Sequence, residues 1–357
     1  MISPEVQKIK EDLMADNPIS EIKDTDWLSS GSTLLNLACS DRTDGAFAKG
    51  HFYSLVGDSS SGKTFLTLTC FAEATINHNF DDYRLIYDAP EEGALMNFRR
   101  FFGKEVVRRV ESPAEDNEEN SCCSETVEEF YKYAMAAFEE GPCVYILDSQ
   151  DALSSGPEAK KWLEEQGGSA KGSYGDGKAK YHSSHIRILL PLLKKHKSIL
   201  IIVCQTRDTM DPFNPKGYSG GKSILFYSTH QMWTGRKTTI KKTVKGKQRR
   251  VGILSKIQVK KNRVTGLDKV VEVPILRSYG IDDIGSCIDY LVEEKTWKKS
   301  GNTVIATGFG PDLRMMRDKL IDHVEENDMI DDLRLLCQST HNEIEEACRA
   351  KRKPKYG

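Results

Sequence analysis

The stretch from Gly57 to Thr64 combines small residues with a lysine and a hydroxyl group, a set suited to binding phosphate. It reads GDSSSGKT and lies between an apolar run at 51–57 and a segment with helical periodicity. This order of strand, small-residue loop and helix is typical of a P-loop, whose backbone amides converge on phosphate oxygens. We predict that Lys63 reaches the β- and γ-phosphates of ATP and that the Thr64 hydroxyl ligates Mg²⁺. The residues expected to bind this cofactor are Gly57, Asp58, Ser59, Ser60, Ser61, Gly62, Lys63, Thr64 and Phe65.

Polar residues at the ends of three further apolar runs extend this chemistry. Asp148 ends the run CVYILD, which is the setting expected of a second acid for the metal. Glu91 and Glu92 follow the run YRLIYDAP, and either one is a candidate for the base that activates water. Gln205 follows a fourth run and is a candidate sensor of the γ-phosphate. The structural alternatives are a turn residue for Asp148 and plain surface charges for the two glutamates.

Four near-continuous apolar runs alternate with helical segments along the first two thirds of the chain. They span 51–57, 83–89, 143–149 and 198–205. Such runs are expected of strands buried on both faces of a parallel sheet, and their alternation with helices predicts an α/β fold. Three later runs predict strands that extend the sheet, at least partly in antiparallel fashion. These runs span 224–236, 251–263 and 269–280.

The chain is expected to have three parts. They are a short amino-terminal helix for oligomerisation, an ATPase core, and a small, mainly helical carboxyl-terminal region with a hairpin and a basic tail. The predicted boundaries are 1–26, 27–292 and 293–357. Two loops rich in glycine and lysine, at about 151–178 and 207–222, follow the carboxyl ends of strands. Ligands of open α/β sheets bind at such ends.

Charge is segregated along the chain although the net charge is only -2. Residues 212–267 contain fourteen Lys and Arg and no acid, whereas residues 110–131 contain eight acids and no base. A long acid-free basic segment indicates a surface that binds a polyanion. The hairpin expected at 236–250 lies inside it, and either binds duplex DNA or is a solvated surface hairpin.

Composition indicates a soluble cytosolic protein. The 357 residues are 38% hydrophobic and 29% charged, and the longest apolar run, 199–204, is too short to cross a bilayer. The amino terminus lacks the pattern of a signal peptide. The nine cysteines include no CxxC pair, so reduced thiols are expected rather than disulfides or a zinc site.

The order of these motifs resembles the RecA family of recombinases, and its phage members more than the bacterial housekeeping protein. The resemblance covers roughly residues 28–292. The segments that carry it are LSSGSTLLNLACSD, GDSSSGKTFLTL, YILDSQDAL, IIVCQTRD, GGKSILFYSTHQMW, QVKKNRVTG and PILRSYGIDDIGSCIDYLVE.

The resemblance implies a RecA-like P-loop NTPase core, with a mostly parallel central sheet flanked by helices. It implies a DNA-dependent ATPase that forms a filament on single-stranded DNA and catalyses homologous pairing and strand exchange with duplex DNA. Lys261 and Arg263 would then reach across the subunit interface to a neighbour's nucleotide, and single-strand-binding and loader proteins become possible partners. The residues expected to bind DNA are Lys171, Lys178, Arg207, Phe213, Lys216, Tyr218, Gly220, Gly221 and Lys222. The site of action would be the cytoplasm, that of the host cell if a phage encodes the chain.

The chain departs from the family pattern at the catalytic acid. The family's glutamate would align near Pro90, so the resemblance moves its role to Glu91 or alters it. The adenine-stacking aromatic is not evident in the motif, and Phe98 is the candidate. Two other functions remain open: a hexameric helicase or translocase on a related core, and an ATP-binding recombination mediator that does not hydrolyse ATP.

Overall fold

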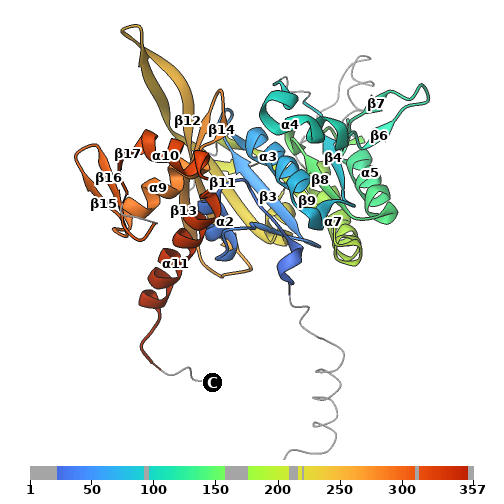
Figure 1. The fold of residues 1–357 in the computed structure, drawn as a ribbon. Coiled ribbons are helices and arrows are strands. Elements are labelled where there is room, and N and C mark those ends of the chain that lie inside the picture. The colour runs from blue at the N-terminus through green and yellow to red at the C-terminus, as the bar shows by residue number, and fades with distance from the viewer. Residues whose placement is uncertain are drawn as a thin grey trace, which may run out of the picture.

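Parallel strands form the centre of the fold in the computed structural model. The structure describes residues 22–91, 96–156, 176–208, 216–218, 221–309 and 313–352. Within these ranges the main sheet has ten strands, in the order β14-β13-β12-β11-β3-β9-β8-β4-β5, with β10 paired to β9 (Figure 1). The strands from β11 to β5 run parallel to one another. Their bounds are β3 (Phe52–Gly57), β4 (Arg84–Asp88), β5 (Val110–Glu111), β8 (Cys143–Leu147), β9 (Ile199–Asp208), β10 (Lys216–Tyr218) and β11 (His230–Val244).

Helices cover both faces of this sheet, which confirms the predicted α/β core. The helices are α3 (Lys63–Ile76), α4 (Phe98–Arg109), α5 (Val127–Glu140) and α7 (Asp176–His196). Alternate strand residues point to opposite faces. Tyr53 and Leu55 pack with α3 in one hydrophobic cluster, whereas Phe52 and Val56 pack with α5 and α7 in another. Burial on both faces explains why the strand runs are apolar without interruption.

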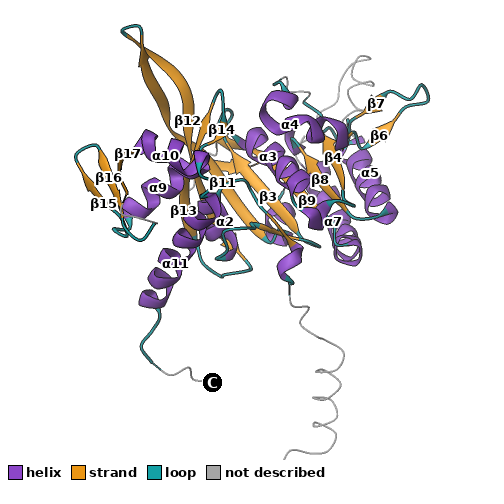
Figure 2. Ribbon diagram, viewed as in Figure 1, coloured by secondary structure: helices purple, strands orange, loops and turns teal. Residues whose placement is uncertain are grey.

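Antiparallel strands extend the sheet beyond β11. They are β12 (Lys247–Asn262), β13 (Lys269–Leu276) and β14 (Gly280–Ile281). The prediction of a strand over the whole of 224–236 is wrong, because α8 (Lys222–Tyr227) occupies its start. The hairpin at 236–250 is ordered as a two-stranded ribbon that projects from the sheet and reverses at Lys245 and Gly246 (Figure 2). Both residues have positive φ, which a tight hairpin turn requires.

The carboxyl-terminal region builds a third hydrophobic cluster. It contains α9 (Asp283–Glu293), β15 (Lys298–Ser300), β16 (Thr303–Ala306), β17 (Leu313–Met316), α10 (Arg317–Glu326) and α11 (Ile330–Cys348). The cluster also includes Leu37 of α2 (Thr33–Ser40) and Ile288 of α9, so it is continuous with helices of the core. The predicted hairpin, β15 and β16, and the two helices are present, but β17 lies between them in the chain and adds a third strand to the hairpin. Of the amino-terminal segment, residues 1–21 lie outside the described residues.

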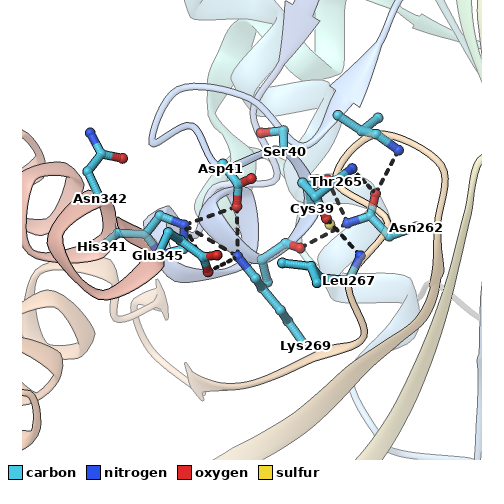
Figure 3. A network of polar contacts seen from close by, with 12 residues as sticks. Cys39, Ser40, Asp41, Asn262, Thr265, Leu267, Lys269, His341, Asn342 and Glu345 are labelled. Carbon is cyan, nitrogen blue, oxygen red and sulfur yellow. Dashed lines mark hydrogen bonds and ion pairs between the residues drawn. The ribbon is translucent and has the colours of Figure 1, made fainter. Parts of the chain in front are cut away.

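A polar network ties α11 to the core (Figure 3). The Lys269 ammonium lies 2.7 Å from Asp41 Oδ1 and 2.7 Å from Glu345 Oε1. His341 Nε2 lies 3.0 Å from the same Asp41 oxygen. Asp41, His341 and Glu345 form a group able to hold a metal ion, but the lysine ammonium already neutralises their charge. This cluster therefore joins elements rather than binding an external cation.

None of the helices in the described part of the chain is long and apolar enough to span a bilayer.

Candidate nucleotide-binding site

The P-loop joins the carboxyl end of β3 to the amino end of α3, as the sequence predicts. The Lys63 ammonium donates to the carbonyls of Gly57 and Asp58, at 2.8 and 2.9 Å. These bonds fold the side chain back over the loop. Burial lowers the pKa of Lys63, while Asp148 and Glu91 oppose that shift. A buried cation bonded to carbonyls on its own loop is suited to exchange them for phosphate oxygens.

Close packing explains why glycine begins and ends the loop. A Cβ on Gly57 would lie 2.0 Å from Thr234 Oγ1 and 2.4 Å from the Thr234 carbonyl of β11. Gly62 has φ of +96° and a Cβ there would lie 2.6 Å from Ile275. Ser61 is buried and its hydroxyl lies 2.8 Å from Thr234 Oγ1. The tertiary structure, as well as the ligand, thus demands small residues here.

Asp148 lies directly beside the loop. Its carboxylate accepts hydrogen bonds from Thr64 and, at 3.2 Å, from the Tyr87 hydroxyl. Burial raises the pKa of Asp148; Thr64, Tyr87 and Lys63 lower it, and Glu91 raises it further. A hydroxyl next to a buried carboxylate is a hard-oxygen set of the kind that Mg²⁺ prefers. A divalent cation would also relieve the repulsion between Asp148 and Glu91, so these residues fit the metal.

Glu91 is bound to the two strands that follow it in the sheet. Its Oε1 accepts a hydrogen bond from Gln205 Nε2 at 2.7 Å and another from the Ser149 hydroxyl. Glu91 thus joins Gln205 to the strand end that carries Asp148. Glu92 lies outside the described residues, so the structure gives geometry for Glu91 alone.

Several site residues were missed by sequence reasoning. Tyr87 and Ser149 contact the predicted acids, and the Thr206 hydroxyl donates to Asp58. Asp151 Oδ2 accepts from the Gln205 backbone amide at 2.6 Å. Their positions in the sequence could have identified them. Each lies near the carboxyl end of a strand or within a few residues after it, at the edge of the sheet where ligands bind.

The two aromatic residues predicted to contact the nucleotide, Phe65 and Phe98, both pack against Phe102. The centre of the Phe65 ring lies 5.1 Å from the ring centre of Phe102 and 5.6 Å from that of Phe101. The centre of the Phe98 ring lies 6.1 Å from that of Tyr87 and 5.8 Å from that of Phe102. These contacts fix α4 against α3 and leave base stacking by Phe98 a prediction.

Basic residues expected to bind DNA flank the two loops. Arg207 lies near the end of β9 with 65% of its side chain exposed, Lys178 lies in the first turn of α7, and exposed Lys222 begins α8. Lys216 pairs through its backbone with Asp208. Lys171, Phe213 and Gly220 lie outside the described residues.

Two further loop residues have structural contacts of their own. The Tyr218 hydroxyl donates to the Gly221 carbonyl, and its ring packs against the cluster under α7 and α8. A Cβ on Gly221 would lie 2.7 Å from the Ala179 Cβ, and its φ is +78°. Glycine at 221 is therefore required by packing, whether or not its amide approaches a phosphate.

Lys261 and Arg263 lie at the far end of the sheet from the P-loop. Lys261 pairs with Gln231, which pairs with Ser54, three residues before Gly57. At about 3.3 Å per residue this offset is about 10 Å along the strand direction, and Lys261 lies two strands away from β3 in addition. The Lys261 ammonium donates to the Leu225 carbonyl at 3.0 Å, and Arg263 donates to the Phe226 carbonyl at 2.8 Å. The two cations thus bind carbonyls near the end of α8.

Comparison with known proteins identifies similar chains. The chain is 30% identical to protein RecA of Chlorobaculum parvum over 277 residues, which cover 77% of this chain and 72% of that protein. It is 26% identical to protein RecA of Malacoplasma penetrans over 321 residues, or 88% and 87% of the two chains. A crystal structure of the RadB recombinase matches 71% of this chain and 98% of its own, with a TM-score of 0.48 and 15% identity. No protein-family model matches the chain.

Proposed function

The chain belongs to the RecA family of recombinases, and from that premise we propose that it is an ATP-dependent recombinase. It assembles as a filament on single-stranded DNA, hydrolyses ATP and catalyses homologous pairing and strand exchange in the cytoplasm. One observation carries this proposal: the nucleotide loop, Asp148, Glu91 and Gln205 meet at one sheet edge, directly beside exposed Arg207.

The chain's own residues divide the work of ATP hydrolysis. The loop amides and Lys63 hold the phosphates, and Thr64 and Asp148 hold Mg²⁺. Bound Mg²⁺ neutralises charge on the phosphate oxygens. Glu91 takes a proton from the attacking water, and its bond to Gln205 places the γ-phosphate sensor next to this base.

A second protomer completes the site in this proposal. Lys261 and Arg263 lie too far from the P-loop of their own chain to act there. Placed against a neighbour's nucleotide they stabilise the charge that develops on the phosphates, as arginine fingers do. ATP then stabilises contact between protomers, and hydrolysis weakens it.

The test of this function is ATP hydrolysis measured with and without single-stranded DNA, followed by strand exchange between homologous DNA molecules. Strong stimulation by DNA together with exchange supports a recombinase. Directional unwinding of a forked duplex without exchange would instead indicate a helicase. Nucleotide binding without turnover on any DNA would indicate a mediator.

Replacing Glu91 with glutamine is expected to reduce hydrolysis by about 100-fold, because the amide cannot accept a proton from water. The amide oxygen still accepts the Ser149 hydrogen bond, so ATP-dependent DNA binding should persist. Steady-state hydrolysis and DNA binding with ATP measure the two effects. The control is Glu139→Gln, an exposed position on α5. Normal hydrolysis by the Glu91 variant would assign the base to another group.

The ribbon of β11 and β12 offers a second surface for DNA. Cations face one another across its ladder, with Lys241 opposite Arg250 and Lys242 opposite Arg249. Like charges opposite each other destabilise a hairpin. Contact with duplex phosphates relieves this repulsion, so we assign the ribbon to duplex capture.

Neutralising Lys241, Lys242, Arg249 and Arg250 to glutamine is expected to weaken duplex binding by about tenfold at low salt. The salt dependence of binding should fall as well, because fewer counterions are released. ATP hydrolysis on single-stranded DNA should be unchanged. Neutralising four exposed lysines of the carboxyl-terminal region, Lys295, Lys298, Lys299 and Lys351, to glutamine controls for net charge. Unchanged duplex binding would make the ribbon a solvated hairpin.

A further inference from the structure

Asp151 lies between the nucleotide edge of the sheet and the basic residues beside the two loops. Its side chain is only 9% exposed, in the short turn that follows β8. Asp151 Oδ2 accepts a hydrogen bond from the backbone amide of Gln205 at 2.6 Å. Oδ1 lies 3.9 Å from Arg207 Nη2 and accepts no hydrogen bond from a residue in the described ranges. The Asp151 carboxylate thus contacts the backbone of the proposed nucleotide sensor through one oxygen and lies near an exposed arginine with the other.

The charges around Asp151 come from both sides of this arrangement. Burial raises its pKa, while the Gln205 amide, Arg207 and Lys178 lower it and Glu91 raises it. Arg207 and Lys178 belong to the residues proposed to bind DNA phosphates. A carboxylate and a phosphate offer a guanidinium the same kind of partner, so the two anions compete for it.

We propose that Asp151 is a positioning residue that competes with DNA phosphates for Arg207, and that Gln205 controls this competition. The inference rests on the proposed function. The Gln205 backbone amide donates to the Asp151 carboxylate, while the Gln205 side chain donates to Glu91. A nucleotide that draws the Gln205 side chain away from Glu91 therefore acts on the strand end that holds the Asp151 carboxylate beside Arg207. While the Gln205 side chain is bonded to Glu91, Asp151 partly neutralises Arg207. When the γ-phosphate of ATP takes the Gln205 side chain instead, Asp151 releases Arg207 to DNA.

Taken by itself, the hydrogen bond from the Gln205 backbone amide has a simpler explanation: a buried backbone N–H needs an acceptor. That requirement is met by any acceptor at position 151, including asparagine or serine. It does not call for a charged group, and burying a charge is unfavourable unless the charge is paired. The negative charge, placed within 3.9 Å of an exposed cation, is the part that the structural role leaves unexplained.

The decisive variant is Asp151→Asn, which keeps the acceptor and removes the charge. Affinity for a labelled single-stranded oligothymidine is measured without nucleotide, with ADP and with a non-hydrolysable ATP analogue. Without nucleotide the variant is expected to bind about fivefold more tightly than the wild type, the scale of a partly exposed ion pair. With the ATP analogue the two proteins should bind equally. The gain should vanish in an Arg207→Gln background, because the pair is then already broken.

Glu139→Gln, a neutralisation on α5, controls for the change in net charge. Equal affinity of Asp151→Asn and wild type in every nucleotide state overturns the inference. An equal gain in every state overturns control by Gln205. If the wild type binds no DNA in any state, the proposed function itself fails, a result distinct from both. Should Asp151→Asn not fold, Arg207→Gln alone decides: it should weaken binding more with the ATP analogue than without nucleotide, and equal weakening rejects the inference.

Discussion

Replacing Lys63 with alanine is expected to lower ATP hydrolysis by about 1,000-fold, the upper range for removing one buried donor from a reacting oxyanion. The ammonium is buried and donates to the Gly57 and Asp58 carbonyls, which places it over the loop expected to hold the phosphates. DNA-stimulated hydrolysis and nucleotide affinity are the measurements. Filament assembly with ATP should be lost together with hydrolysis, because both depend on the bound phosphates.

The control for this variant is Lys104→Ala, at an exposed position of α4. Thermal unfolding of both variants tests whether the loop remains folded, since two loop hydrogen bonds are removed with Lys63. Full hydrolysis by a folded Lys63→Ala protein would contradict the assignment of this loop to ATP.

Replacing Lys261 and Arg263 together with alanine is expected to reduce DNA-stimulated hydrolysis by about 1,000-fold, the effect typical of lost arginine fingers. Nucleotide affinity of the free protomer should change little, because Lys261 lies two strands away from β3 and level with Ser54, three residues before the P-loop. Lys260→Ala is the matched control: its ammonium lies 3.9 Å from the centre of the Trp233 ring. Unchanged stimulation in the double variant would remove the proposed role at the interface.

A mixing experiment separates action on a neighbour from action within one chain. The Lys63→Ala protein has a defective loop and intact cations, whereas the Lys261→Ala, Arg263→Ala protein has the reverse. In an equal mixture, about a quarter of head-to-tail interfaces combine an intact loop with intact cations. Hydrolysis should therefore reappear on mixing two inactive proteins. No recovery in filaments shown to contain both proteins would contradict action in trans.

The pH dependence of assembly supplies a further check on Lys261. Burial, followed by the charge of Arg263, lowers its pKa to about 8. The lysine is charged below this pH and neutral above it, and phosphate binding requires the charged form. Assembly must therefore take up a proton above pH 8, so ATP-dependent assembly should weaken there by up to about tenfold per pH unit. Lys261→Arg, which stays charged, should remove this loss.

Local sequence was sufficient to predict the nucleotide loop and the strands around it. The residues from Gly57 to Thr64 are contiguous, and the signals of strand, small-residue loop and helix all lie within about 25 residues of chain. Asp148 and Gln205 could be placed near this loop without knowing strand order, because the carboxyl ends of parallel strands meet at one edge. The same rule did not select between Glu91 and Glu92, because the two residues are adjacent and both follow the same strand.

Tertiary structure decided which of these groups touch and which way they face. Glu91 meets Gln205 because β4 and β9 both pair with β8, so their carboxyl ends lie two strands apart at the same edge of the sheet. This strand order is set by long-range pairing. Asp151 acquires its partners in the same way. The placement of Lys261 away from its own P-loop depends on the register of β11 with β3. Strand order and register arise from contacts between residues far apart in the chain, and periodicity reports only which faces of a segment are buried.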